Sequence, residues 1–185
     1  MIAWETEIAN ALARGKAEQK CIMLEFFSPQ CIGCQQMESV TFNDLAVQNF
    51  LTDRMIPMQA TTTSTLAADF RVVWTPTVMV LDFYGREHQR TIGFMPAEEM
   101  VASLLLGIGK SALDNGQYNE AVLQLNTLLN GYPESAAAPE AVYLRGVSRF
   151  KSTQSAAVLK ECYQQLSGQY PDSDWAKRAQ PFSLL

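Results

Sequence analysis

The sequence predicts an α/β sandwich over residues 1–106, followed by an all-helical domain over residues 107–185. Three observations carry this prediction. An apolar, strand-like run turns at Ser28–Pro29 into a helix that begins at two cysteines, and a second apolar run returns as a hairpin. A four-residue turn motif also recurs 38 residues later in a segment without strand signals. With 185 residues, 48% of them hydrophobic, the chain can bury one large core or two modest ones.

Residues 2–16 are the first predicted helix, which ends near Gly15. Their apolar members recur at helical spacing. These members are Trp4, Ile8, Ala11 and Leu12. The next segment, residues 21–27, is almost continuously apolar, which is typical of a central strand covered on both faces.

The cysteine segment follows this strand and is predicted to be helical to about Val40. Cys31 and Cys34 then lie on the first helical turn. Two thiols three positions apart can close a small disulfide ring, and the N–H groups and dipole of the helix start stabilise a thiolate at the first of them. The pattern therefore predicts redox chemistry at Cys31 and Cys34.

Four further elements are predicted before the hairpin turn. Asn43 or Asp44 caps a helix over residues 45–51, and residues 55–60 form a strand. A polar loop leads into a short helix over residues 66–70. Beyond it, residues 78–83 form a strand.

The hairpin turns at Tyr84–Arg86 and returns over residues 88–93. A closing helix has Pro96 near its first turn. Its predicted buried face consists of Met100, Val101, Leu104 and Leu105.

The helical domain contains an internal repeat. Tyr132-Pro133-Glu134-Ser135 recurs as Tyr170-Pro171-Asp172-Ser173, and the same shift aligns apolar positions of the helices before the two turns. Together with Tyr143, Leu144 and Gly146 this resembles the tetratricopeptide family, although fewer than two and a half units are present and the spacing exceeds the usual ~34 residues.

So short an array seldom buries its faces alone. We therefore expect its first helix, over residues 105–113, to continue from or pack on the closing helix of the first domain. The resemblance implies that the repeats dock a protein partner or substrate. Self-association through residues 175–182 is the alternative, because the apolar face of the last helix would otherwise meet water.

The first domain resembles the thioredoxin superfamily over roughly residues 5–105. The resemblance rests on Cys31 and Cys34 after a strand, Thr75–Pro76 before a strand and Glu25 inside the first strand. Residues 34–47 are more narrowly similar to the group that includes the C-terminal domains of transmembrane disulfide reductases. The resemblance implies a central mixed sheet flanked by helices.

The same resemblance assigns roles to residues. It makes Cys31 the exposed nucleophile and Cys34 the buried resolving thiol. Glu25 matches the family's buried acid, which should have a raised pKa and take the proton from Cys34; a water-exposed acid at a strand edge is the alternative.

Pro76 matches the cis-proline of the family. Only the resemblance supports the cis isomer, because the sequence alone would favour a trans bond. This implies that the backbone of Thr75 lies beside the cysteines and pairs with an extended substrate segment. Phe27, Ile32 and Trp74 would then form the rim of the site.

Departures from the family pattern affect the expected chemistry. Gln30 and Gln35 stand where the family commonly has a tryptophan and a basic residue. The pair Ile32–Gly33 contains neither proline nor histidine, which favours a reductant or exchange catalyst over a strong oxidant. Gln59-Ala60-Thr61 contains no lysine to pair with Glu25, so we expect the pKa of Glu25 to be raised more strongly.

Composition limits the possible ligands. A net charge of −5 without basic clusters argues against nucleic acid, and no apolar run is long enough to span a membrane. We expect no cofactor beyond a redox-active Cys31–Cys34 disulfide. A zinc site would need ligands from Cys21, Cys162 and His88, none of which has another at ligand spacing. Cys21 and Cys162 are expected to be core residues, and His88 is expected to be a surface or edge residue.

Two functional classes follow. The first is a thiol–disulfide oxidoreductase that acts on protein disulfides and is re-reduced by an upstream dithiol. The second is an interaction module whose cysteines sense redox state with little turnover. No export segment is visible in the sequence, so a cytoplasmic location is expected, with export after removal of a signal as the alternative.

Overall fold

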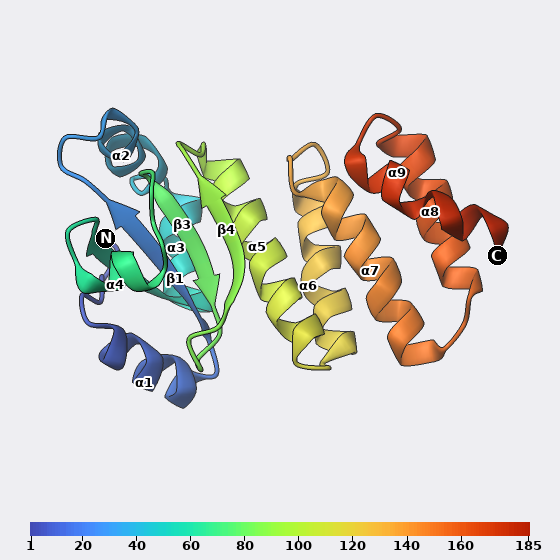
Figure 1. Ribbon diagram of the computed structural model, residues 1–185, viewed down its shortest axis with the longest axis horizontal. Coiled ribbons are helices and arrows are strands. Elements are labelled where there is room, and N and C mark those ends of the chain that lie inside the picture. Colours follow the sequence, from blue (N-terminus) through green and yellow to red (C-terminus); the bar gives the residue numbers. More distant parts are fainter. The chain divides into compact units, whose positions relative to one another are not determined.

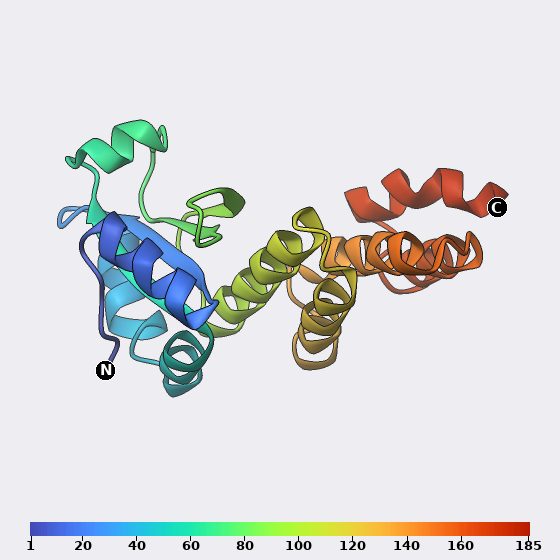
Figure 2. The same ribbon diagram turned by 90° about the horizontal axis from the view of Figure 1, so that it is seen from below.

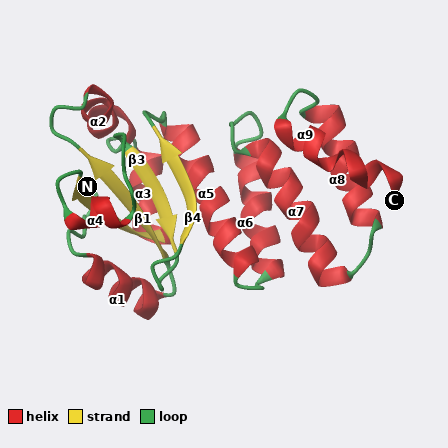
Figure 3. Ribbon diagram, viewed as in Figure 1, coloured by secondary structure: helices red, strands yellow, loops and turns green.

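The computed structural model describes residues 1–185, and the chain divides into two compact units, residues 1–107 and 108–185 (Figure 1). The first unit combines strands and helices, whereas the second contains only helices and turns (Figure 3). No helix is both long and apolar enough to cross a bilayer.

The first unit is built on a four-stranded sheet with the order β2-β1-β3-β4. The central strand β1 (Cys21–Phe27) runs parallel to β2 (Met55–Thr61) and antiparallel to β3 (Thr77–Leu81). The edge strand β4 (Glu87–Ile92) pairs antiparallel with β3. The sheet is therefore mixed, as the resemblance to thioredoxins implies.

Helices cover both faces of this sheet. In Figure 2, α4 (Thr65–Asp69, green) and α3 (Leu45–Arg54, teal) lie on opposite sides of it. The remaining long helices of the unit are α1 (Ile8–Glu18) and α5 (Ala97–Asp114). The fold class predicted from the sequence is thus confirmed.

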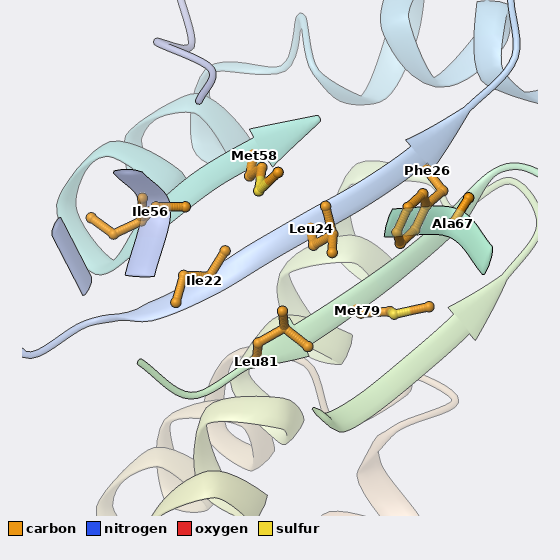
Figure 4. Packing of buried hydrophobic residues seen from close by; sticks show 9 residues of the cluster. Ile22, Leu24, Phe26, Ile56, Met58, Ala67, Met79 and Leu81 are labelled. Atoms are coloured by element: carbon orange, nitrogen blue, oxygen red, sulfur yellow. The ribbon is translucent and has the colours of Figure 1, made fainter. Parts of the chain in front are cut away.

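One core cluster fills the face covered by α1 and α4 (Figure 4). Alternate residues of β1 contribute to it because side chains of a strand point to opposite faces in turn. Burying each of its larger side chains contributes about 1.5–3 kcal/mol to stability. The cluster consists of Ala11, Ile22, Leu24, Phe26, Ile56, Met58, Ala67, Met79 and Leu81.

The predicted start of the first helix was wrong. Helix α1 begins only at Ile8, and the residues before it are largely extended. Glu5 forms a parallel bridge to Met58, with Glu5 N–H donating to Pro57 O at 2.9 Å and Gln59 N–H donating to Glu5 O at 3.0 Å. An exposed edge of β2 would leave these backbone groups unpaired, so pairing at this edge replaces the first helical turn.

The cysteine helix α2 (Ile32–Gln36) continues into a π-helical turn over Met37–Thr41. Asp44 then caps α3, because its Oδ1 accepts hydrogen bonds from Ala46 N–H at 2.8 Å and Val47 N–H at 3.2 Å. Of the two caps predicted, Asn43 or Asp44, the structure thus uses Asp44.

Helix α5 is continuous from Ala97 to Asp114, so the helix expected over residues 105–113 continues the closing helix of the first unit. Four more helices and a short 3₁₀ turn follow. They are α6 (Tyr118–Gly131), α7 (Ala138–Thr153), α8 (Ala157–Gln169), α9 (Asp174–Ala179) and the turn Gln180–Leu184.

The two copies of the repeated turn have the same geometry. Tyr132 has φ −138° and ψ 52°, and Tyr170 has φ −134° and ψ 52°. In each copy a serine hydroxyl donates to the tyrosine carbonyl, at 2.8 Å for Ser135 and 2.7 Å for Ser173. The sequence repeat therefore corresponds to a structural repeat.

Candidate functional site

Cys31 lies at the N-terminal end of α2 and Cys34 one turn later. Cys31 is the N-cap residue, and its Sγ accepts a hydrogen bond from the backbone N–H of Cys34 at 3.3 Å. The Ser28–Pro29 turn places it there, because Cys31 N–H donates to Ser28 O at 3.0 Å. Both cysteines are unpaired thiols; Cys31 is partly exposed and Cys34 is buried.

The loop before β3 lies against this dithiol. The Thr75–Pro76 bond is cis, and the thiol of Cys31 donates to the carbonyl oxygen of Thr75 at 3.3 Å. A Cβ on Gly33 would lie 3.1 Å from Cδ of Pro76, so the two segments pack closely. The fold thus brings together predicted site residues that are 44 positions apart in the sequence.

The two thiols differ in acidity. Partial burial raises the pKa of Cys31, but hydrogen bonds with Cys34, with the Thr75 side chain and with backbone N–H groups outweigh this and lower it. Burial, followed by the hydrogen bond with Cys31, raises the pKa of Cys34 to about 11. Cys31 is therefore the thiol that ionises first.

Glu25 is buried in β1, with 1% of its surface exposed, which rules out the alternative of a water-exposed acid at a strand edge. Burial raises its pKa to about 7; a hydrogen bond from Gln59 acts in the opposite direction, and the charge of Glu38 adds to the rise. Gln59 lies opposite Glu25 in the β1–β2 register, and its Nε2 donates to Oε2 of Glu25 at 2.8 Å.

A pocket of about 560 Å³ joins the buried acid to the buried thiol. Glu25, Gln59 and Cys34 all line it, so the two groups share one cavity. The other lining residues are Trp4, Phe27, Ser28, Pro29, Gln35, Glu38, Ser39 and Asn43. No sequence pattern pointed to Trp4 and Asn43 at this place, since they come from segments that only the fold assembles.

Large apolar side chains are exposed in the two segments that meet at Cys31. Ile32 is 80% exposed and Trp74 is 69% exposed. Val73, which sequence reasoning did not select, is 80% exposed. Phe27, by contrast, is half-buried and lines the pocket on the Cys34 side.

Other candidate residues lie elsewhere. Cys162 is buried, as expected, and its thiol donates to Val142 O at 3.5 Å. His88, expected to be a surface or edge residue, lies on the edge strand β4, but its side chain is only 3% exposed. Its Nε2 lies 3.1 Å from Oδ2 of Asp82, because the hairpin turn folds the two inward together. No group of three or more His, Cys, Asp or Glu side chains is placed to hold a metal ion.

A family model described as a thioredoxin-like domain matches residues 8–107, which is more than half of the chain. The chain belongs to the thioredoxin-like family. Its thioredoxin-like domain is 35% identical over 106 residues to the thiol:disulfide interchange protein DsbD of Escherichia coli strain K12. The match covers 53% of this chain but only 18% of that relative.

Solved structures agree with this assignment. A thioredoxin from Thermus thermophilus is 27% identical with a TM-score of 0.54, covering 63% of this chain and 95% of the thioredoxin. A putative disulphide-isomerase from Bacteroides thetaiotaomicron is 22% identical with a TM-score of 0.52, covering 58% of this chain and 93% of its own, and shares the fold. This family and an intact Cys-x-x-Cys pair support a thiol–disulfide oxidoreductase role for the thioredoxin-like domain.

Proposed function

We propose that Cys31 and Cys34 reduce or exchange disulfides of protein substrates, with Cys31 as the attacking thiolate and Cys34 as the resolving thiol. One observation supports this most directly. The sulfur of Cys31 lies 3.3 Å from both Cys34 N and Thr75 O. Of the thiols of Cys31 and Cys34, only that of Cys31 has a lowered pKa. Such a sulfur ionises more readily than that of Cys34 and lies within reach of a partner beside Thr75.

The reaction proceeds in two exchanges. The Cys31 thiolate attacks one sulfur of a substrate disulfide, forms a mixed disulfide and expels the other substrate sulfur as a thiolate. Cys34 then loses its proton and attacks the sulfur of Cys31, which releases the second substrate thiolate. Two electrons pass to the substrate, and Cys31–Cys34 becomes a disulfide that an upstream dithiol must reduce.

Glu25 is proposed to accept the proton of Cys34 in the second exchange. A thiol with a pKa of about 11 is almost fully protonated near neutrality and needs a base. A carboxyl with a pKa of about 7 is partly ionised there and lines the same pocket as Cys34. The pocket is large enough for water to carry the proton between the two groups.

The backbone of Thr75 is proposed to hold the substrate as an added strand. Its N–H has no partner among the backbone hydrogen bonds of the loop, and its carbonyl binds only the Cys31 thiol. Ionisation of Cys31 before its attack removes that thiol proton, and the carbonyl stays free in the mixed disulfide. Both groups can then pair with an extended substrate segment.

Trapping of the mixed disulfide tests this function. A Cys34→Ser variant should stay covalently linked to its clients through Cys31, and the links should disappear in the Cys31→Ser, Cys34→Ser double variant. The wild-type chain should also catalyse reduction of a test disulfide by dithiothreitol. Absence of both adducts and catalysis would favour the alternative of a redox-sensing interaction module.

The helical unit is proposed to consist of tetratricopeptide-like repeats that dock a client or partner. The matching turns at Tyr132 and Tyr170 support this, as does the hydrogen bond of 2.7 Å from the Tyr170 hydroxyl to Pro133 O that links them. Leu123, exposed by 57% on α6, is a candidate contact. Adding Leu123→Glu to the Cys34→Ser trap should remove a subset of clients, whereas Gln164→Glu on α8 should remove none.

A further inference from the structure

Trp4 lies on the same face of the sheet as the buried acid Glu25. Side chains of a strand point to the two faces in turn. Glu5 pairs with Met58, whose side chain belongs to the core cluster on the face covered by α1 and α4 (Figure 4). Trp4, the residue before Glu5, therefore points to the other face. Glu25 points to that face too, because the residues before and after it both belong to the core cluster.

Contacts on both faces of the sheet hold Trp4 in place. On one face, the Glu5 side chain forms an ion pair with Arg14 of α1 at 2.6 Å, and the backbone of Glu5 is hydrogen-bonded to β2. On the other face, the rings of Trp4 and Phe42 meet edge to face with 5.1 Å between their centroids, and Phe42 is buried. The indole therefore has one defined position at the edge of the sheet.

This position is in the wall of the pocket that Glu25 shares with Cys34. Trp4 has the largest of the side chains that line the pocket, and it is the only lining residue from the N-terminal segment. Trp4 itself is partly exposed, whereas Glu25 is buried. Its indole thus forms part of the boundary between the pocket and solvent.

The groups around Glu25 make its ionisation sensitive to water. Its register partners in the two neighbouring strands, Gln59 and Val78, are uncharged. The other titratable groups that line the pocket are Cys34 of α2 and Glu38 of the π-helical turn, and no Lys, Arg or His lines it. Without a cation in the pocket, the carboxylate of Glu25 depends on the Gln59 amide and on any water that enters.

We propose that Trp4 is a positioning residue for the resolving step, in which its indole keeps bulk water away from the carboxyl of Glu25. This inference rests on the proposed function. In that step the S–H bond of Cys34 breaks, its proton passes to a carboxylate oxygen of Glu25, and its electron pair forms the bond to Sγ of Cys31. The bond from Cys31 to the substrate sulfur breaks at the same time, and the substrate leaves as a thiolate.

Exclusion of water makes Glu25 a suitable base near neutral pH. Burial is the main cause of its raised pKa, and a base whose pKa lies near the working pH is the most effective. A small side chain in place of the indole admits water, which favours the carboxylate. Trp4→Ala should therefore move the midpoint of the pH dependence of release to lower pH by about one unit. Trp4→Phe should keep most of the wild-type profile.

Oxidised glutathione is the probe for this test. The full chain, reduced beforehand and freed of reductant, is mixed with an excess of the probe from pH 5 to 9, and samples are quenched in acid. Intact-mass spectrometry measures the chain that carries one glutathione and the chain that has formed the Cys31–Cys34 disulfide. At high probe concentration the conversion of the first into the second no longer depends on that concentration, and its rate reports the release.

Further variants assign the effect to the indole. Glu5→Ala is the matched control, because Glu5 is the next residue and its side chain contacts α1 on the opposite face; its profile should match the wild type. In a chain that carries Glu25→Gln, adding Trp4→Ala should change the release rate by less than about twofold, because Trp4 acts through Glu25. If Trp4→Ala does not fold, Trp4→Leu, which keeps an apolar contact with Phe42, should shift the midpoint less but in the same direction.

The outcomes separate the two proposals. If the wild-type chain forms no glutathione adduct and no Cys31–Cys34 disulfide, the proposed function fails. The role of Trp4 is wrong, while the oxidoreductase function stands, if Trp4→Ala or Trp4→Leu keeps the wild-type midpoint, if Glu5→Ala shifts it equally, or if the effect persists without Glu25. A shift that Trp4→Phe largely abolishes and that needs Glu25 supports the role of Trp4.

Discussion

Gln59 holds one carboxylate oxygen of Glu25, with 2.8 Å between its Nε2 and Oε2, across the parallel pair β1–β2. It is the only side chain seen to hydrogen-bond this buried acid, and it carries no charge. An uncharged partner stabilises the ionised form less than a cation would. The pKa of Glu25 is therefore free to rise towards neutrality.

We predict that Gln59→Lys lowers the pKa of Glu25, because a nearby cation favours the carboxylate. The pH dependence of the resolving step should shift to lower pH accordingly. The rate at which a mixed disulfide on Cys31 is released, measured from pH 5 to 9, reports this shift. Gln164→Lys, on the exposed surface of α8, should leave the profile unchanged; an identical shift in both variants would disprove a local effect.

Glu25 should also make stability depend on pH. Its folded-state pKa is raised from 4.5 to about 7, so its favourable contribution is present below pH 4.5 and is lost as pH rises through 7. At pH 8 the loss amounts to about 3 kcal/mol at most. Glu25→Gln should therefore raise the free energy of unfolding at pH 8 and change it little at pH 4.

Urea unfolding of wild type and Glu25→Gln at both pH values measures this difference. The same variant should slow release of the mixed disulfide by about 10²-fold, since the step loses its general base. If Glu25→Gln changes the free energy of unfolding equally at pH 4 and pH 8, the pKa of Glu25 is not raised in the folded state.

Alkylation should distinguish the thiols near neutral pH. Cys34 and Cys162, each with a pKa of about 11, are ionised to only about one part in 10⁴ at pH 7. Cys31, with its lowered pKa, should react with iodoacetamide at least about 10²-fold faster than Cys162. Peptide mass mapping over time measures the rates, and similar rates would contradict the assignment of Cys31 as nucleophile.

Asp82 should be a stability determinant of the hairpin. Its buried carboxylate accepts hydrogen bonds from the N–H groups of Tyr84 and Arg86 at 2.9 and 3.0 Å and contacts His88 at 3.1 Å. Asp82→Ala removes these hydrogen bonds and should cost about 2–3 kcal/mol.

Chemical denaturation of Asp82→Ala tests this, with Asp53→Ala as a control at an exposed site that should change stability by less than about 0.5 kcal/mol. Although burial raises the pKa of Asp82, its hydrogen bonds outweigh this and lower it. The carboxylate therefore stabilises the fold above the unfolded pKa, and this contribution disappears as the pH falls through the folded value. The difference between Asp82→Ala and wild type should shrink accordingly in acid.

Gly146 should be intolerant of a side chain. A Cβ there would lie 2.6 Å from Cβ of Cys162, so α7 and α8 would have to separate. Gly146→Ala should destabilise the helical unit by about 1–3 kcal/mol. Gly168→Ala, in α8 with open space around it, should be neutral or stabilising by up to about 1 kcal/mol. Thermal unfolding of both variants compares them directly.

The parts of the fold that the sequence predicted depend on local signals. The run from Cys21 to Phe27 was predicted as a strand with its observed bounds, because a continuous apolar segment ended by Ser-Pro allows little else. The start of α3 followed from the preference of Asp44 for the N-cap position. The closeness of Thr75–Pro76 to Cys31, by contrast, was expected only from the resemblance to thioredoxins.

What could not be predicted depends on pairing across the chain. Residues 2–7 look helical by periodicity, yet Glu5 pairs with β2, a choice that only the exposed strand edge explains. The partnership of Gln59 with Glu25 follows from strand register, which neither segment encodes alone. His88 was expected on the surface or at an edge; it lies on the edge strand β4, but nothing local indicates that its ring turns inward to Asp82.

The junction between the two units is not a linker, since Gly107 and Ile108 are consecutive residues within the continuous helix α5. A protease needs an extended peptide in its cleft, and a hydrogen-bonded helical turn does not offer one. Limited proteolysis should therefore spare this junction. A recombinant fragment that ends at residue 107 would end inside helix α5. Fragments of the two units that are produced separately should therefore each include the whole helix from Ala97 to Asp114.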